Sequence, residues 1–373
     1  MATTTLINTA KKKVCVVTPV HWSAGMGGAE YQLKFLVEAL SETTDCEIFY
    51  LARIINRQFR AESHKVIQVG HEKSIARYAS IFDAPGLLRA LKGIQPDFIY
   101  QRVGGGYTGI AAWYAGRYKA KLVWHISSDW DVQPMSEPIS RTTPFLYLEK
   151  KALEYGIKRA DVIIAQTQRQ SNLLQANYGR KASTVIRNGH PFPIDPLIKT
   201  DPVKVIWIAN WKPLKRPELF VQLARELSAE TDAQFIMIGK HNANDQMYNI
   251  LKDAKRLKNL QCMGKQPQEV INELLAGSHL LVNTSAYEGL PNTFIQAWMR
   301  KVPVLSISID PDGLLSREGL GIVGGSYKGL RKSLLDMIQN SSARITMGER
   351  AWRYSRKAFS IENIRRSVEL IME

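Results

Sequence analysis

The turn after the apolar run 279–283 carries the residue types best suited to chemistry. It holds a carboxylate, Glu288, followed by Gly289, Leu290, Pro291 and Asn292 and then by an apolar helical pattern, with Pro291 expected at the first helical position. The first amides of a helix have no carbonyl partner inside the helix, and with the helix dipole they bind anions, most often phosphate. A carboxylate only accepts hydrogen bonds, so Glu288 suits sugar hydroxyls. The alternative is an exposed turn with an incidental acid.

A second set of polar side chains follows the first apolar run of the second half, residues 203–209. It consists of Asn210, Lys212, Lys215 and Arg216, just before a helical pattern. Cationic side chains at a strand end can neutralise a diphosphate. Lysine-rich loops are also often only solvated.

The first half of the chain adds two weaker signals. Gly25, Gly27 and Gly28 separate the first apolar run from the first helical pattern, and a glycine-rich turn there can cradle a phosphate or admit an acceptor. His125 ends the apolar run 121–125. A short glycine run is common, and a single histidine is more often structural than functional.

Two pairs of aspartates have the D-x-D spacing that can hold a divalent metal. They are Asp129 with Asp131 and Asp310 with Asp312. Hard cations prefer such oxygen ligands, yet paired aspartates are also common in turns. We predict no metal site.

Positioning these residues requires two sets of strands. Short, uniformly apolar runs alternate with helical patterns along the chain, which indicates parallel sheets covered on both faces. A proline-dense stretch, 188–202, separates two such series and predicts two doubly wound domains. We predict domains at 1–195 and 203–350 and a C-terminal helix at 351–373. Ligands of such sheets bind beyond the carboxyl ends of the strands, where the residues named above lie.

Composition narrows the class of protein. The 373 residues are 45% apolar and 23% charged, as in globular proteins, and no apolar run approaches the ~20 residues of a membrane-spanning helix. The N-terminus lacks the order of a signal peptide. Cys15, Cys46 and Cys262 are dispersed and odd in number, which fits neither a disulfide framework nor a zinc site and favours a cytoplasmic location.

The formal net charge of +16 indicates which kinds of binding partner the protein favours. A basic protein can bind nucleic acid, an anionic membrane face or phosphorylated small molecules. Because no zinc finger, RNA-binding sheet signature or arginine-rich arm is visible, we expect no nucleic-acid partner. The excess of positive charge suits peripheral attachment to the inner face of the cell membrane. Alternatively, it only keeps the protein soluble.

In order and spacing these segments resemble the family 4 glycosyltransferases, which have the GT-B fold of two doubly wound, Rossmann-like parallel-sheet domains facing a cleft. The likeness extends over residues 13–338. It rests on GGAE (27–30), His125, RADVIIAQT (159–167), VIRNG (185–189), WKPLKRPELF (211–220), FIMIGK (235–240), LQCMGK (260–265) and SAYEGLPNTFIQAWMRKVPVL (285–305). The last segment is the most specific.

The resemblance implies a retaining transferase that moves a sugar from a nucleotide sugar to a saccharide or lipid-linked saccharide, as in cell-surface polysaccharide synthesis. The donor would lie mainly on the second domain and the acceptor mainly on the first, with the C-terminal helix crossing back to the first domain. A UDP-sugar is the first expectation and GDP-mannose the second. No cofactor or metal is expected, because amides and lysine can stabilise the leaving diphosphate.

Carried over by position, the resemblance also assigns roles. Glu288 would bind hydroxyls of the transferred sugar, and Lys215 with the 289–292 backbone would hold the diphosphate. His125 would lie beside the donor sugar, and Gly28 near its phosphate or the acceptor.

Two positions depart from the family pattern. Gln296 stands where the family has a glutamate that binds ribose, and it exchanges a charge-assisted hydrogen bond for a weaker neutral one. Asn210 stands where an arginine is usual. Lys212 or Arg216 could replace that charge, although a lysine amine does not reproduce a guanidinium fork.

Two other functions fit the same sequence. A nucleotide-sugar epimerase of the same two-domain shape would use the donor without an acceptor. A non-catalytic sugar-nucleotide or polyanion-binding protein would fit the departures at Gln296 and Asn210. The sequence indicates no oligomeric state.

Overall fold

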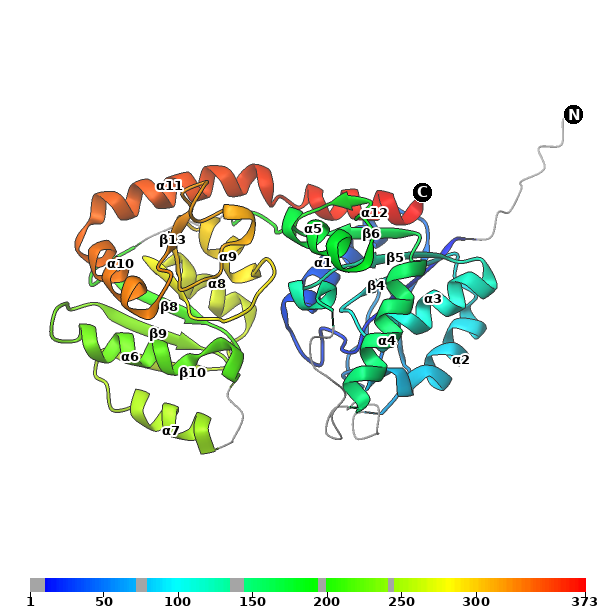
Figure 1. The fold of residues 1–373 in the computed structure, drawn as a ribbon, viewed down its shortest axis with the longest axis horizontal. Coiled ribbons are helices and arrows are strands. Elements are labelled where there is room, and N and C mark those ends of the chain that lie inside the picture. Colours follow the sequence, from blue (N-terminus) through cyan, green and yellow to red (C-terminus); the bar gives the residue numbers. More distant parts are fainter. Residues whose placement is uncertain (1–10, 72–78, 135–143, 194–198, 241–244) are drawn as a thin grey trace, which may run out of the picture. The chain divides into compact units, whose positions relative to one another are not determined.

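The structure is a computed structural model that describes residues 11–71, 79–134, 144–193, 199–240 and 245–373. The chain divides into two units, Met1–Asn188 with Glu362–Glu373, and Gly189–Ile361 (Figure 1). Each unit is built on one parallel sheet with helices, so the predicted α/β class with two doubly wound domains is confirmed. Residues 1–10 and residues 194–198 of the expected linker lie outside the described residues.

The first unit contains a seven-stranded sheet in the order β3-β2-β1-β4-β5-β6-β7. Its strands are β1 (Lys13–Val17), β2 (Glu47–Ala52), β3 (Lys65–Gln68), β4 (Phe98–Arg102), β5 (Lys121–His125), β6 (Val162–Ala165) and β7 (Thr184–Val185). Its helices are α1 (Gly28–Thr43), α2 (Ala84–Ile94), α3 (Gly106–Tyr118), α4 (Pro144–Arg159), α5 (Gln168–Tyr178) and α12 (Glu362–Met372).

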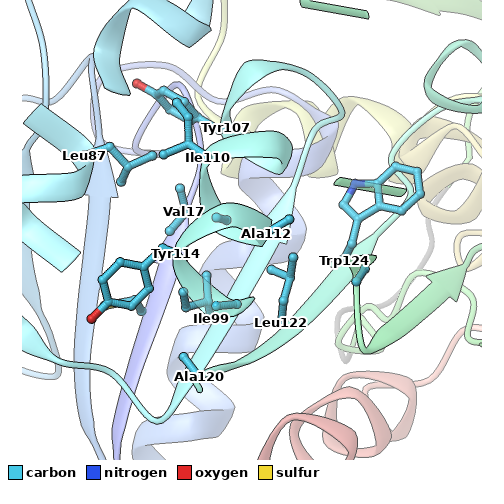
Figure 2. Close-up of a cluster of buried hydrophobic side chains, with 14 of the residues drawn as sticks. Val17, Leu87, Ile99, Tyr107, Ile110, Ala112, Tyr114, Ala120, Leu122 and Trp124 are labelled. Atoms are coloured by element: carbon cyan, nitrogen blue, oxygen red, sulfur yellow. The ribbon is translucent and has the colours of Figure 1, made fainter. Parts of the chain in front are cut away.

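Apolar residues on successive strands form the core of this unit. Val17, Ile99 and Leu122 come from β1, β4 and β5, and they pack with Ile110 and Tyr114 of α3 (Figure 2). All five side chains are at most 5% exposed. The central strands are apolar at nearly every position because helices cover both faces of the sheet.

The second unit contains a six-stranded parallel sheet in the order β10-β9-β8-β11-β12-β13. Its strands are β8 (Lys204–Ile208), β9 (Gln234–Ile238), β10 (Leu260–Gly264), β11 (Leu280–Asn283), β12 (Val304–Ser306) and β13 (Gly321–Val323). Its helices are α6 (Pro217–Leu227), α7 (Asp245–Ala254), α8 (Gln268–Ala276), α9 (Asn292–Trp298), α10 (Tyr327–Gln339) and α11 (Ser341–Ala358).

Strand order reverses beside the first strand of each sheet. In the first unit β1 lies between β2 and β4, and in the second unit β8 lies between β9 and β11. The helices after neighbouring strands then leave toward opposite faces, which opens a crevice at the carboxyl ends of the pair. The β1/β4 and β8/β11 edges are therefore the places to look for ligands.

The C-terminal segment differs in part from the prediction. The C-terminal helix predicted at 351–373 is not one helix: its first part is the end of α11, in the second unit, and the rest is α12, in the first. Ile364, Val368 and Ile371 of α12 are buried, and Lys121 Nζ donates to the Leu370 carbonyl oxygen at 2.9 Å. The expected crossing back to the first domain is thus confirmed for α12 alone. In the described residues, no helix has the length and apolar character needed to cross a bilayer.

Two glycines allow α3 and α4 to approach closely. A Cβ on Gly109 of α3 would lie 2.4 Å from the Ala152 carbonyl oxygen, and one on Gly156 of α4 would lie 2.8 Å from the Thr108 carbonyl. Gly116, in the same helix as Gly109, would meet nothing within 4 Å. The close approach therefore depends on Gly109 and Gly156 and not on glycine content in general.

We predict that Gly109→Ala lowers the free energy of unfolding of the first unit by about 1–3 kcal/mol, because the backbone of α4 must move. Gly116→Ala is the matched control, and it should leave stability unchanged or raise it by up to ~1 kcal/mol, because alanine favours the helix. Urea unfolding followed by circular dichroism measures both. Equal midpoints for the two variants would contradict the described α3–α4 packing.

Candidate functional site

The polar loops of the second unit meet because two strands are neighbours. β8 pairs with β11 in parallel, with Val205 opposite Leu280 and Ile206 opposite Leu281. Their carboxyl ends therefore lie at one edge, and the loops 209–216 and 284–291 begin there side by side. Most of the residues predicted to bind the donor lie in these two loops.

The loop after β8 is held by main-chain hydrogen bonds. Trp211 N donates to the Lys240 carbonyl oxygen at 2.8 Å, and Lys215 N donates to that of Lys212 at 2.8 Å, which closes a short turn, Pro213–Lys215. Lys212 itself is exposed. Asn210 Oδ1 accepts from Lys240 N at 3.4 Å, so this amide side chain lies at the carboxyl end of β9.

Thr284 and Arg216 tie the two loops together. The Thr284 hydroxyl lies 2.6 Å from the Lys215 carbonyl oxygen and accepts from Trp207 Nε1 at 2.9 Å. Arg216 Nε donates to the Thr284 carbonyl oxygen at 2.5 Å, and Arg216 Nη2 donates to that of Ser285 at 3.0 Å. Arg216 thus uses two of its nitrogens to hold the second loop, and its predicted contact with the donor stays a prediction.

Glu288 and Lys215 form an ion pair at this edge. Lys215 Nζ contacts Glu288 Oε1, which also accepts from Ser285 Oγ at 2.9 Å. The two charged side chains are 20% and 19% exposed. A partly buried, hydrogen-bonded pair of this kind has a defined geometry, unlike most surface ion pairs. One cation and one carboxylate are therefore fixed together beside the crevice.

The turn after Glu288 leads into α9 one residue later than expected. Pro291 is the N-cap, with φ −66° and ψ 127°, and the seven-residue helix begins at Asn292, whereas the sequence placed Pro291 at the first helical position. Leu290 is 5% exposed and belongs to the apolar core. Only its main chain could contact a ligand.

His190 fixes the side chain of Asn292. His190 Nε2 lies 2.9 Å from Asn292 Oδ1, and the imidazole is 2% exposed. Burial lowers the pKa of His190 to about 4, so the ring is neutral at pH 7. A neutral ring that carries its proton on Nε2 donates this hydrogen bond to the amide oxygen.

Gln296 lies one helical turn after Asn292, on the same side of α9. It is 5% exposed, and its main-chain carbonyl oxygen accepts from Arg300 Nη1 at 3.1 Å. Its predicted role in ribose binding stays a prediction, as do the diphosphate contacts of Gly289 to Asn292.

The predicted residues of the first unit lie at the carboxyl edge of its own sheet. Gly28 begins α1, and the Gly27 amide donates to Glu30 Oε2 at 3.1 Å, so a carboxylate already lies at this helix N-terminus. His125 ends β5 and is 3% exposed, with its Nδ1 2.6 Å from the Tyr100 hydroxyl. Burial and the nearby Arg102 charge hold the pKa of His125 well below its ordinary value.

The aspartate pairs have local partners. Asp131 accepts from the amides and hydroxyls of Ser127 and Ser128, and Asp129 pairs with Arg169 at 2.9 Å. Asp310 accepts from the Leu315 amide at 2.8 Å. The described parts of the chain contain no group of three or more His, Cys, Asp or Glu side chains that could hold a metal ion.

Sequence reasoning missed Thr284 and Ser285, which hold Lys215, Arg216 and Glu288 in place. The available signal was a pair of small hydroxyl residues directly after the apolar strand 280–283, at the edge where ligands of parallel sheets bind. Tyr100 was also missed, because its hydroxyl meets His125 only through the pairing of β4 with β5.

Comparison with known proteins agrees with this architecture. Residues 192–351 match the family model "Glycosyl transferases group 1", and residues 26–191 match "Glycosyltransferase Family 4". No curated protein sequence gave a significant match.

Solved structures share the fold at low sequence identity. Anabaena HepE in complex with UDP and glucose superposes with a TM-score of 0.71 at 17% identity, covering 97% of this chain and 99% of that one. Sucrose-phosphate synthase from Thermosynechococcus elongatus superposes with a TM-score of 0.79 at 14% identity, covering 97% of this chain and 98% of that one. WaaG, a glycosyltransferase involved in lipopolysaccharide biosynthesis, superposes with a TM-score of 0.73 at 13% identity, covering 96% of this chain and 99% of that one.

The two family models adjoin and leave only the ends of the chain unmatched, and the two parallel-sheet units are those of the GT-B fold. The chain therefore belongs to the family 4-type glycosyltransferases.

Proposed function

We propose that this glycosyltransferase moves a hexose from a UDP-sugar to a saccharide or lipid-linked saccharide with retention of configuration, in cell-surface polysaccharide synthesis. GDP-mannose is the second candidate donor. The observation that carries the proposal is the Lys215–Glu288 pair, held at the β8/β11 edge by Ser285 and Thr284. The complexes of HepE with UDP and UDP-glucose support the choice of nucleotide.

The pair provides one partner for each half of a nucleotide sugar. Lys215 carries the positive charge that a diphosphate needs, and Glu288 carries the acceptor oxygens that sugar hydroxyls need. A donor that enters this edge exchanges the internal ion pair for two external contacts, so neither charge is left without a partner.

Stabilisation of the leaving group is the chemistry that these residues supply. Negative charge builds on the diphosphate as the sugar–phosphate bond breaks, and a fixed cation and oriented amides of residues 289–292 stabilise that charge in the transition state. These groups do the work for which a metal ion is otherwise used, so the proposed reaction needs none.

Retention is supported by the scarcity of carboxylates. Glu288 is the only acidic residue in loops 209–216 and 284–292, and it is already paired with Lys215. We infer that the acceptor hydroxyl attacks from the side of the leaving group and that the departing phosphate takes its proton. A covalent sugar–enzyme intermediate is not required.

A basic basin on the first unit supports peripheral attachment to an anionic membrane. It has a volume of about 850 Å³ and lies between the C-terminal ends of α3 and α4. Its lining includes Arg117, Lys119 and Arg159 and the indole of Trp113, which is 45% exposed. Basic side chains attract anionic lipid headgroups, and exposed tryptophan suits the membrane interface.

Replacing either member of the central pair should slow transfer without unfolding the protein. We expect Lys215→Met and Glu288→Gln each to lower kcat by about 10²–10³, the effect of losing one fixed group that stabilises the transition state. Lys258→Met and Glu273→Gln, which replace exposed residues of the second unit outside the two loops, are the matched controls and should have little effect.

The measurement is transfer from the UDP- or GDP-sugar that most raises the thermal midpoint of the wild-type protein, since a ligand that binds the folded form stabilises it. Unchanged kcat in Lys215→Met and Glu288→Gln would remove the pair from the donor site. An isomerised nucleotide sugar would indicate an epimerase, and tight binding without turnover would indicate a binding protein.

Chelation provides a separate test of the metal-independent reaction. Because Lys215 and the amides supply the positive potential, excess EDTA should leave kcat unchanged after dialysis. Loss of activity that Mg²⁺ or Mn²⁺ restores would show that the leaving group is stabilised by a metal instead.

Attachment through the basin predicts a loss of vesicle binding in the double variant Arg117→Gln, Arg159→Gln. Each basic residue near an anionic surface contributes ~1 kcal/mol, about fivefold in affinity, so the loss of both arginines should lower vesicle affinity by roughly 25-fold. Arg256→Gln, Lys328→Gln removes the same charge from the second unit and is the control. Sedimentation with phosphatidylglycerol vesicles measures both, and equal binding by the two variants would exclude the basin.

A further inference from the structure

A basic cavity of the second unit lies at the amino edge of its sheet. The cavity has a volume of about 560 Å³, and its lining includes Lys199, His279 and Lys301. Lys199 precedes β8, His279 directly precedes β11, and Lys301 lies in the turn before β12. Lys215 and Glu288 follow the carboxyl ends of β8 and β11, so the cavity and that pair lie at opposite ends of the same strands.

Two cations that line the cavity have main-chain carbonyl groups as partners. Lys199 Nζ donates to the Lys301 carbonyl oxygen at 2.7 Å. Arg344 Nη1 donates to the carbonyl oxygens of Met337 and Ile338 at 2.7 and 2.8 Å. Because a carbonyl group carries no net charge, neither cation is neutralised by these contacts, and each keeps further N–H groups for a ligand.

Positive charge exceeds negative charge around the cavity. Burial and the charges of Arg344 and Lys301 lower the pKa of Lys199 to about 8, although the nearby Glu349 opposes the shift. Glu349 is the one carboxylate among the described lining residues, and it pairs with Lys301 at 2.5 Å. Asp201 also attracts Arg344, but it is exposed. A bound anion would supply the negative charge that Lys199 and Arg344 lack.

His279 adds an uncharged donor to the same cavity. Its Nδ1 accepts from the Lys204 amide at 3.0 Å, so a neutral ring carries its proton on Nε2. Burial and the charges of Lys199 and Arg344 lower the pKa of His279 to about 4, so the ring is neutral at pH 7. The Nε2–H group is therefore what this side chain can offer to a ligand.

These donors suit a phosphoryl group, whose oxygens accept hydrogen bonds and carry negative charge. The cavity is larger than a phosphate ion needs, and its volume falls within the ~300–1,000 Å³ of small-molecule sites. The lining also includes the half-buried indole of Trp352 and the carboxylate of Glu349. An apolar ring face and an acceptor of this kind suit a sugar ring and its hydroxyl groups.

We propose that this cavity binds a phosphorylated sugar, whose phosphoryl group is held by Lys199, Arg344 and His279. The site goes beyond the proposed transfer reaction, because it shares no residue with the carboxyl edge of β8 and β11. It also does not depend on which nucleotide sugar is the donor.

NMR of protein labelled with ¹⁵N histidine reports binding at this cavity alone, since phosphate bound near Lys215 lies at the other end of the strands. His279→Gln assigns the signal. Inorganic phosphate at pH 7 should shift the His279 Nε2 resonance to saturation, whereas chloride at equal ionic strength should not. A signal that stays unchanged at about 10 mM phosphate, ten times a weak Kd of ~1 mM, would overturn the proposal.

Removing the two cations should weaken phosphate binding. We expect the double variant Lys199→Gln, Arg344→Gln to raise the Kd from the His279 signal by at least about tenfold, because two charge-assisted hydrogen bonds are lost. The control Arg256→Gln, Lys328→Gln removes the same charge from exposed positions of the second unit and should leave the Kd unchanged. Equal weakening in the two double variants would overturn the assignment of Lys199 and Arg344.

A gain of affinity is a stricter test, because a damaged fold cannot produce it. Glu349→Gln removes the carboxylate of the cavity and should tighten phosphate binding about two- to fivefold. Glu318→Gln is the matched control: Glu318 pairs with Arg317 and is 34% exposed, against 35% for Glu349, but it does not line the cavity. Phosphate binding that is unchanged or weaker in Glu349→Gln would overturn the phosphoryl site.

Glucose 1-phosphate tests the sugar part of the proposal. It should shift the His279 signal at lower concentration than inorganic phosphate does, because the sugar ring adds contacts with Trp352. Trp352→Leu should remove this advantage and leave phosphate binding intact. Equal affinities of the wild type for glucose 1-phosphate and phosphate would overturn the sugar contact and assign the cavity to the phosphate ion alone.

Discussion

The parallel pairing of β8 with β11 is the constraint on which the polar edge of the second unit depends. The paired residues Val205 and Leu280 lie 75 positions apart in the chain, yet the carboxyl ends of their strands are neighbours. Only this pairing allows Arg216 to hold the carbonyl oxygens of Thr284 and Ser285 and Lys215 to reach Glu288. The apolar core around these strands therefore determines the polar geometry, because a shift of one residue in either strand would turn its side chains to the other face.

The carboxyl edge of the sheet is built differently in the two units. In the second unit a cation and a carboxylate neutralise each other at the surface of the crevice, where they are about one-fifth exposed. In the first unit the polar groups at strand ends are buried and have local partners: Tyr100 pairs with His125, and Arg102 donates to Asn188 Oδ1. The first arrangement suits charged ligand groups, and the second suits hydroxyl groups, which carry no net charge.

The sequence was sufficient for the fold and for bringing the loops of Lys215 and Glu288 to one sheet edge, but not for the hydrogen bonds between these loops. Uniform apolar runs identify parallel strands, and parallel strands place their following loops at one edge, so Lys215 and Glu288 could be assigned together. Their support by Ser285 and Thr284 could not, since hydroxyl residues are common in loops and their partners come from distant parts of the chain. The single tail helix was wrong because α11 and α12 have similar helical patterns, and only packing against different units separates them. The position of Pro291 was one residue off, as helix ends often are.

The first unit is discontinuous in the chain, since α12 returns to it after the whole of the second unit. During synthesis the ribosome therefore produces β1 to β7 long before the helix that covers α1 and β4. Domains generally fold as they emerge, yet here the earlier one remains incomplete until residues 362–372 have left the exit tunnel. Translation that stops shortly before α12 would release a finished second unit joined to a first unit with an uncovered apolar surface, which favours aggregation.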